Sequence, residues 1–107
     1  MTIDELVDNF GVFDDWEGRY SYLIDLGNKL PFMDPALKTE ESKVRGCMSQ
    51  VWMLLGWGKD GRMTMVADSD AQIVRGLIAV LGVVYLGKSR EEIQNINIVF
   101  HFSYFYR

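Results

Sequence analysis

The sequence has few of the residues that most often carry catalysis or brace a small fold. Its 107 residues include one cysteine, Cys47, and one histidine, His101. One cysteine cannot form an intrachain disulfide, and it falls short of the ligands that a structural zinc site or an iron–sulfur cluster needs. We therefore expect no metal site, no bound cofactor and a reducing, cytoplasmic location.

Positive charge is also scarce, with 11 Lys and Arg against 15 Asp and Glu and a formal net charge of −4. Nucleic-acid phosphates call for clustered cations, so no nucleic-acid partner is expected. The start, MTIDELVDNF, lacks the basic residues and apolar core of a signal peptide. The longest apolar run, Ile73 to Leu86, contains Arg75 and is too short to span a bilayer. No membrane association is therefore expected.

What remains is the composition of a soluble globular protein, with 49% hydrophobic and 24% charged residues. A chain of this length predicts a single domain over residues 1–107. The expected elements, in order, are a helix over 2–10, a helix from Asp14 to about Leu30, strands over 50–57 and 62–67 joined at Lys59-Asp60-Gly61, a helix from Asp68 or Ser69 to about Leu86, and a short helix from Ser89.

Apolar patterns predict which faces of these elements are buried. Trp16, Tyr20 and Leu23 share the apolar stripe of the second helix, which is expected to face the core. The strand over 50–57 is apolar on both faces and is expected to be fully buried, with Trp52 in the core. The helix that ends near Leu86 is almost wholly apolar, so it is expected to lie at the centre.

Cys47 lies in the stretch VRGCMSQVWM, just before the first predicted strand. A lone cysteine is most often a small buried hydrophobe, and composition alone slightly favours that interpretation. The position favours a reactive thiol, because Gly46 lets the backbone turn and Cys47 precedes the strand instead of joining it. Arg45 and Lys43 are close in sequence, and nearby cations stabilise the thiolate that reacts.

Two apolar neighbours, Val44 and Met48, flank the sulfur and are expected to shield it. A thiol hydrolase would need a histidine base, and His101, in the aromatic end of the chain, is a weak candidate. A disulfide oxidoreductase would need a second cysteine. A covalent carrier needs only one mobile thiol, which attacks a donor, holds the adduct and gives it to a partner.

Three blocks of sequence, RYSYLIDLGNKLP, VRGCMSQVWM and DSDAQIVRGLIAVL, closely resemble the SufE family of sulfur acceptors. The blocks follow the order and spacing of the family, and the resemblance runs from about Asp4 to Asn97. It implies an α+β fold in which helices pack on a small antiparallel sheet, a two-layer fold similar to the IscU scaffold protein.

The resemblance also implies a function. Cys47 aligns with the family's acceptor cysteine, which takes sulfane sulfur from a SufS-type, pyridoxal-phosphate-dependent cysteine desulfurase and becomes a persulfide. The sulfur then passes to a SufBCD-type scaffold complex that assembles iron–sulfur clusters. By this analogy the chain stimulates the desulfurase and has no turnover of its own.

Further candidate residues surround the cysteine. The resemblance makes Arg45, Gly46, Ser49 and Gln50 candidate loop or docking residues. Ser49 and Gln50 would orient the thiol by hydrogen bonds, or they would serve only as turn and strand-start residues.

The acids and the serine before the central helix are also candidates. Asp68, Ser69 and Asp70 are expected to cap that helix. By resemblance, Asp70 also lies beside the cysteine loop, where it tunes docking or thiol exposure. Arg75 either pairs with an acid or faces solvent.

The end of the chain departs from the family pattern. Five aromatic residues fall between Phe100 and Tyr106. They are compatible with a terminal strand that needs cover from other elements. We expect a truncated or divergent C-terminus with an atypical tail over 98–107. Two other functions stay open, a desulfurase-docking module that transfers nothing and an independent cysteine enzyme.

Overall fold

The computed structural model describes residues 1–96 of the chain. Its elements are α1 (Ile3–Gly11), α2 (Trp16–Asn28), the 3-10 helix η1 (Pro35–Leu37), β1 (Val51–Trp57), β2 (Met63–Ser69), α3 (Gln72–Tyr85) and α4 (Arg90–Gln94). The helices pack on a two-stranded antiparallel sheet, so the expected α+β fold is confirmed. The possible strand in the aromatic tail, and His101 with it, lies outside the described residues.

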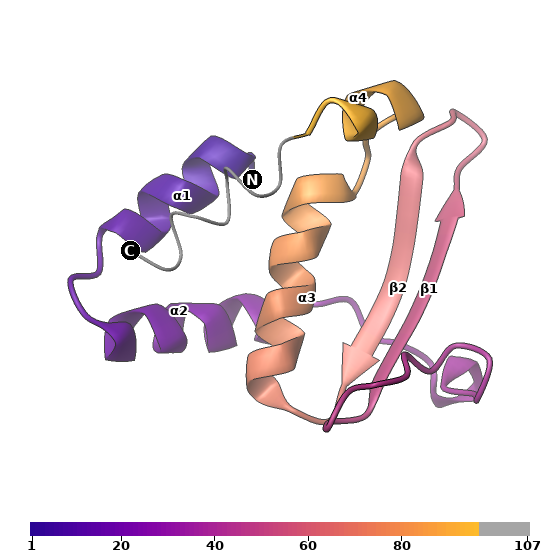
Figure 1. Ribbon diagram of the computed structural model, residues 1–107, viewed down its shortest axis with the longest axis horizontal. Helices are drawn as coiled ribbons and strands as arrows, with labels where there is room; N and C mark the ends of the chain where they lie inside the picture. Colours follow the sequence, from indigo (N-terminus) through magenta and orange to yellow (C-terminus); the bar gives the residue numbers. More distant parts are fainter. Residues whose placement is uncertain (97–107) are drawn as a thin grey trace.

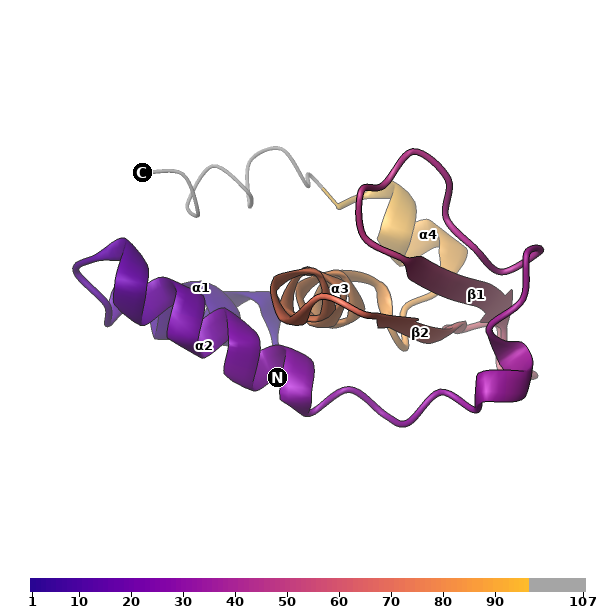
Figure 2. The same ribbon diagram turned by 90° about the horizontal axis from the view of Figure 1, so that it is seen from below.

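Helix α3 lies between α2 on one side and the sheet on the other (Figures 1 and 2). Apolar clusters form on both sides of it. The first joins α1, α2 and α3 through Leu6, Phe10, Leu23, Leu26 and Val80. The second joins α3 to the strands through Val51, Ala67 and Ile78. The expected central position of this almost wholly apolar helix is confirmed.

Two glycines let α2 and α3 approach closely. A Cβ atom added at Gly27 would lie 2.6 Å from the backbone nitrogen of Gly76, and one added at Gly76 would overlap the carbonyl oxygen of Leu23. Any larger residue would therefore push the two backbones apart. At this contact α2 crosses α3 with the two backbones close together (Figure 1), which sets one side of the core.

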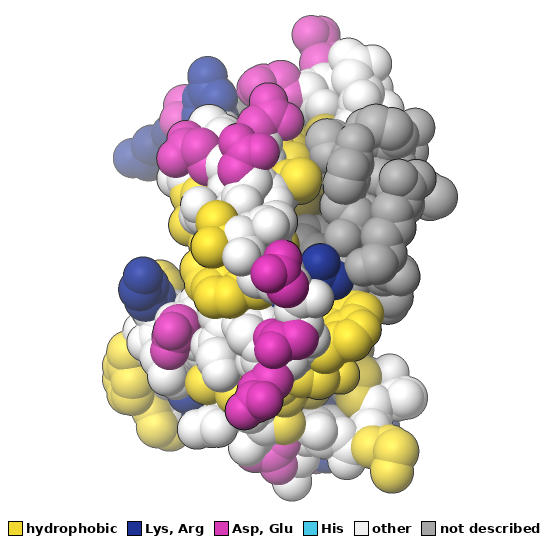
Figure 3. Space-filling model, turned by 90° about the vertical axis from the view of Figure 1, so that its left-hand side faces the viewer, with side chains coloured by type: hydrophobic (Ala, Val, Ile, Leu, Met, Phe, Trp, Pro, Cys, Tyr) yellow, Lys and Arg dark blue, Asp and Glu magenta, His cyan; other side chains and the backbone are white. Residues whose placement is uncertain are grey.

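The start of α2 differs from the expectation. Asp15, and not Asp14, is the N-cap, and its side chain accepts a hydrogen bond from the Gly18 N–H. Trp16 and Tyr20 are half-exposed and pack against each other instead of facing the core. The first turns of α2 extend beyond α3 (Figure 1), and that end of the molecule shows exposed apolar and acidic side chains (Figure 3).

Among the described residues, α-helices cover only one face of the sheet. Val51 pairs with Ser69 and Trp57 with Met63, which directs alternate residues of both strands toward α3. Leu54, on the other face, is 39% exposed, and Leu55 is 58% exposed. Full burial of β1 is therefore a wrong expectation, because α3 lies mainly over β2 and leaves the end of β1 uncovered.

Candidate functional site

Cys47 lies on a short loop whose two ends are hydrogen-bonded to each other. The Val44 N–H donates to the carbonyl oxygen of Val51 (2.8 Å), and the Met53 N–H donates to that of Ser42 (2.7 Å). Lys43 forms an isolated antiparallel bridge within this pairing. We call this pairing of 42–44 with 51–53 the neck, and residues 45–50 the cysteine loop. The neck makes the loop a hairpin-like projection at one end of the sheet (Figure 2).

Local sequence explains both the turn and the neck. Gly46 has φ +84°, a left-handed conformation that favours glycine, although a Cβ there would meet nothing within 4 Å. The buried Ser42 hydroxyl donates to the carbonyl oxygen of Leu37 (2.7 Å) and accepts from the Thr39 N–H (3.0 Å). Ser42 thus folds the chain back before it pairs with β1, a role that no periodic pattern indicated.

The other end of the cysteine loop is anchored to the connection between β2 and α3. The Ser69 hydroxyl donates to the carbonyl oxygen of Gln50 (2.7 Å), and the Asp70 N–H donates to the same oxygen (3.2 Å). The Gln50 N–H in turn donates to Asp70 Oδ1 (3.0 Å). The structure therefore brings Gln50 and Asp70 together, and it adds Ser69, which sequence analysis had taken for a helix cap.

The expected capping of α3 is wrong in detail. Ala71 is the N-cap and makes no side-chain cap bond, while Asp68 and Ser69 belong to β2. Their side chains have other partners: Asp68 binds cations and Ser69 binds the cysteine loop. Ser69 Oγ still accepts from the Ala71 N–H (3.2 Å), so one amide near the helix start has a side-chain acceptor.

The thiol of Cys47 is exposed. Met48 is fully exposed at 107% of its reference area, and Val44 is 37% exposed. The expectation that these two apolar residues shield the sulfur is therefore wrong. The cause is the projection of the loop, which extends past the neck and leaves its tip without cover from the described elements.

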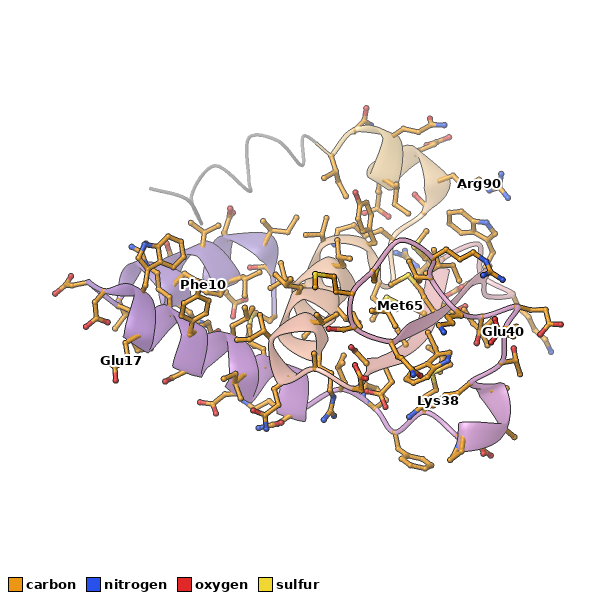
Figure 4. The ribbon with its side chains drawn as sticks, turned by 60° about the horizontal axis from the view of Figure 1, so that its bottom comes forward. Phe10, Glu17, Lys38, Glu40, Met65 and Arg90 are labelled. Atoms are coloured by element: carbon orange, nitrogen blue, oxygen red, sulfur yellow. The ribbon has the colours of Figure 1, made fainter. Side chains whose placement is uncertain are left out.

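Arg45 has a partner that the local sequence did not suggest. Its guanidinium lies 3.7 Å from the carboxylate of Glu40, and the two side chains are 79% and 74% exposed. Glu40 comes from the turn before the neck, so folding brings an acid to a loop whose own sequence has none (Figure 4). Such an exposed pair contributes little stability, but it offsets the positive charge near the thiol. Ser49 is half-buried, and its hydroxyl forms no hydrogen bond with residues 1–96.

A cluster of charges lies on the same end of the sheet. Lys38 Nζ lies 2.8 Å from Asp68 Oδ2, and Arg75 Nε lies 3.1 Å from Asp68 Oδ1 without hydrogen-bond alignment. Lys38 also lies over the ring of Trp52, 5.0 Å from its centroid, and this half-buried ring is on the sheet rather than in the core (Figure 4). Of the two possibilities for Arg75, pairing with an acid is the one observed.

The cluster changes the titration of Asp68. Partial burial raises the pKa of this carboxyl, but the hydrogen bonds from Lys38 and from the Ser69 N–H, together with the charges of Lys38 and Arg75, lower it more. The pKa of Asp68 therefore lies below its ordinary value. An ionised Asp68 ties the segment before the neck to both the sheet and α3.

Other features of the described chain lie apart from the cysteine. Residues 1–96 contain no group of three or more His, Cys, Asp or Glu that is suited to a metal ion. None of the helices described over that range is long and apolar enough to cross a membrane. An apolar groove of about 450 Å³ runs between the end of α2, β2 and α3, and its lining includes neither Cys47 nor an acid.

Fold and site together define a small α+β protein that presents one exposed thiol on a loop with fixed ends. The SufE family, described as an Fe-S metabolism associated domain, matches residues 4–105. The chain belongs to this family, and it therefore has a role in iron–sulfur metabolism. The matched region extends beyond Asn97, so the expectation that the resemblance stops there is wrong.

Two relatives illustrate the match. An uncharacterized SufE-like protein of Rhizobium meliloti (strain 1021) is 42% identical over 99 residues, which is 90% of this chain and 71% of the relative. An uncharacterized SufE-like protein of Rhizobium etli is 42% identical over 105 residues, which is 95% of this chain and 71% of the relative.

Proposed function

We propose that this chain is a sulfur acceptor and carrier that works with a SufS-type cysteine desulfurase. Cys47 accepts sulfane sulfur as a persulfide and passes it to a SufBCD-type scaffold, and docking of the chain stimulates the desulfurase. The observation that carries the proposal is the exposed thiol at the tip of a loop with hydrogen-bonded ends. Family membership supports it, because it implies association with a cysteine desulfurase.

The transfer step balances without any further reactant. The Cys47 thiolate attacks the terminal sulfur of a persulfide on the desulfurase. A new S–S bond forms at Cys47, the S–S bond of the donor breaks, and the donor cysteine leaves as a thiolate that recovers its proton from solvent. No net oxidation occurs, because the sulfane sulfur keeps its oxidation state as it moves between two thiols.

The shape of the site suits this step. A nucleophile that works inside a second protein must reach beyond its own fold, and the cysteine loop projects past the neck. Because the neck and the Gln50 anchor fix both ends of the loop, little of it has to be ordered when it enters the partner.

The proposal is tested by incubating the chain with a cysteine desulfurase, pyridoxal phosphate and cysteine, followed by intact-mass measurement. We expect the mass of one or more sulfur atoms to be added, and dithiothreitol to remove it. Cys47→Ser should add none, because a hydroxyl does not hold sulfane sulfur, while the matched loop variant Ser49→Ala should load like the wild type.

The outcomes separate the alternatives. Removable sulfur on Cys47→Ser, or none on the wild type with a competent desulfurase, would contradict the carrier function. Binding to the desulfurase that is indifferent to Cys47 and brings no sulfur would instead indicate a docking module. Turnover of a thiol substrate without any partner would indicate an independent enzyme.

A further inference from the structure

Met48 is the most exposed large apolar side chain among residues 1–96, at 107% of its reference area. A single exposed apolar residue is common on protein surfaces and has no meaning by itself. What distinguishes Met48 is its place, one residue after the only thiol of the chain. Two other strongly exposed apolar residues, Val12 at 74% and Phe32 at 85%, flank no such group.

The exposure of Met48 is a property of an anchored loop. The Val44 N–H binds the carbonyl oxygen of Val51 at one end of the loop. At the other end, the Ser69 hydroxyl donates to the carbonyl oxygen of Gln50. Met48 therefore lies between two fixed points of the chain. In a segment without such anchors, the position of this side chain would not be defined.

The rest of the loop leaves Met48 as the apolar contact beside the sulfur. Arg45 is engaged by Glu40, and Val44 lies at the neck with only 37% of its surface exposed. Gly46 has no side chain. An incoming protein surface that reaches Cys47 therefore also meets the exposed side chain of the next residue, Met48.

We propose that Met48 is a docking residue that enters an apolar recess of the cysteine desulfurase beside its sulfur donor. This inference rests on the proposed function, because it is the approach of Cys47 to the donor that brings Met48 into the partner. Consecutive Cα atoms lie only 3.8 Å apart, so a donor site that admits Cys47 must also accommodate its neighbour. Methionine suits that position, because it is unbranched, adaptable and enriched at protein interfaces.

The test measures how desulfurase stimulation and sulfur loading depend on the concentration of the chain. Met48→Gln keeps the length of the side chain but replaces its apolar end. We expect the half-saturating concentration to rise roughly ten-fold, since burial of one apolar side chain is worth about that factor. Met48→Leu should stay within about three-fold of the wild type, and both variants should reach the same final sulfur content.

Two controls separate docking from other effects. Alkylation of Cys47 by iodoacetamide should proceed at the same rate in Met48→Gln and the wild type, which shows that the free thiol is unchanged. Val12→Gln makes the same kind of substitution at an exposed apolar residue of the connection between α1 and α2, and it should leave half-saturation unchanged.

A half-saturating concentration for Met48→Gln within two-fold of the wild type would overturn the docking role and leave the carrier function standing. Faster loss of loaded sulfur to dithiothreitol at unchanged half-saturation would also overturn it, because Met48 would then shield the persulfide. Dimerisation of the chain that Met48→Gln abolishes would make a second copy the true partner of this residue. Absence of sulfur on the wild type would overturn the proposed function itself, and this inference with it.

Discussion

Replacement of Ser69 by alanine should loosen the cysteine loop. Ser69 is buried, with only 6% of the residue exposed, and its hydroxyl joins two segments that are far apart in sequence. It donates to the carbonyl oxygen of Gln50 at 2.7 Å and accepts from the Ala71 N–H at 3.2 Å. Ser69→Ala removes both bonds while keeping the backbone of β2.

The size of the effect follows from what each former partner retains. The Gln50 carbonyl oxygen keeps its hydrogen bond from the Asp70 N–H. Loss of the bond from Ser69 should therefore cost only the net value of one hydrogen bond, about 1 kcal/mol. The Ala71 N–H also loses a side-chain acceptor, but Ala71 is only half-buried, so water can replace part of that bond. The two losses together should lower the free energy of unfolding by about 1–3 kcal/mol.

Part of this loss should appear locally at the cysteine loop. A weakening of about 1 kcal/mol at the Gln50 anchor makes opening there about five-fold more frequent. Amide hydrogen exchange at Gln50 and Val44 measures the opening, and urea denaturation measures the global loss. Ser49→Ala is the matched control, and it should change stability by less than about 0.5 kcal/mol. Unchanged exchange at Gln50 in Ser69→Ala would show that the hydroxyl does not anchor the loop.

Two further predictions concern the core and the charge cluster. Gly76→Ala should lower the free energy of unfolding by about 1–3 kcal/mol, because the new Cβ meets the backbone of Leu23. In the control Gly82→Ala the new Cβ meets only flexible side-chain ends, so the loss should be smaller. Equal midpoints of urea denaturation for the two variants would refute this. The stability advantage of the wild type over Asp68→Asn should be full at neutral pH. This advantage should shrink as the pH falls below about 4, because a carboxyl with a lowered pKa stabilises the fold only while it is ionised. Urea titrations of both proteins at pH 7 and pH 2.5 test this. The same stability difference between wild type and Asp68→Asn at both pH values would contradict it.

The sequence allowed the fold to be predicted where a pattern determines burial by itself. The run from Ile73 to Leu86 is apolar on every side, and such a helix is stable in water only when other elements cover it, as α3 is. The same argument failed for β1. Its apolar residues indicated that burial of β1 under another element would be favourable. They did not indicate that α3 would lie mainly over β2 and leave Leu55 exposed.

The site could be predicted in part. Cys47 was indicated by its position after Gly46 and before a strand as well as by a resemblance, while Asp70 followed from the resemblance alone. The structure places Asp70 against the backbone of the cysteine loop. Glu40, Ser42 and Lys38 could not be anticipated, because they lie in an irregular segment whose path depends on single hydrogen bonds and ion pairs, not on a repeating pattern.

The wrong capping assignment has a similar origin. Acids and serines before an apolar helix indicate a cap because short polar side chains commonly bind the first free amides. That rule says nothing of competing partners. In this fold Asp68 binds two cations, and the Ser69 hydroxyl donates to the cysteine loop while it also accepts from the Ala71 N–H.

The exposure of Cys47 also bears on how sulfur would travel. A persulfide at this position would have little cover from the loop itself, because Cys47 is exposed and its apolar neighbours Met48 and Val44 are exposed as well. Any thiol in solution can then attack it, so the lifetime of the free loaded chain depends on the surrounding thiols. Within a complex the partner surface would supply the missing cover, and under the docking proposal Met48 would contact that surface beside Cys47. Loading and protection would thus depend on the same contact, which favours direct handover between docked proteins over a long-lived free carrier.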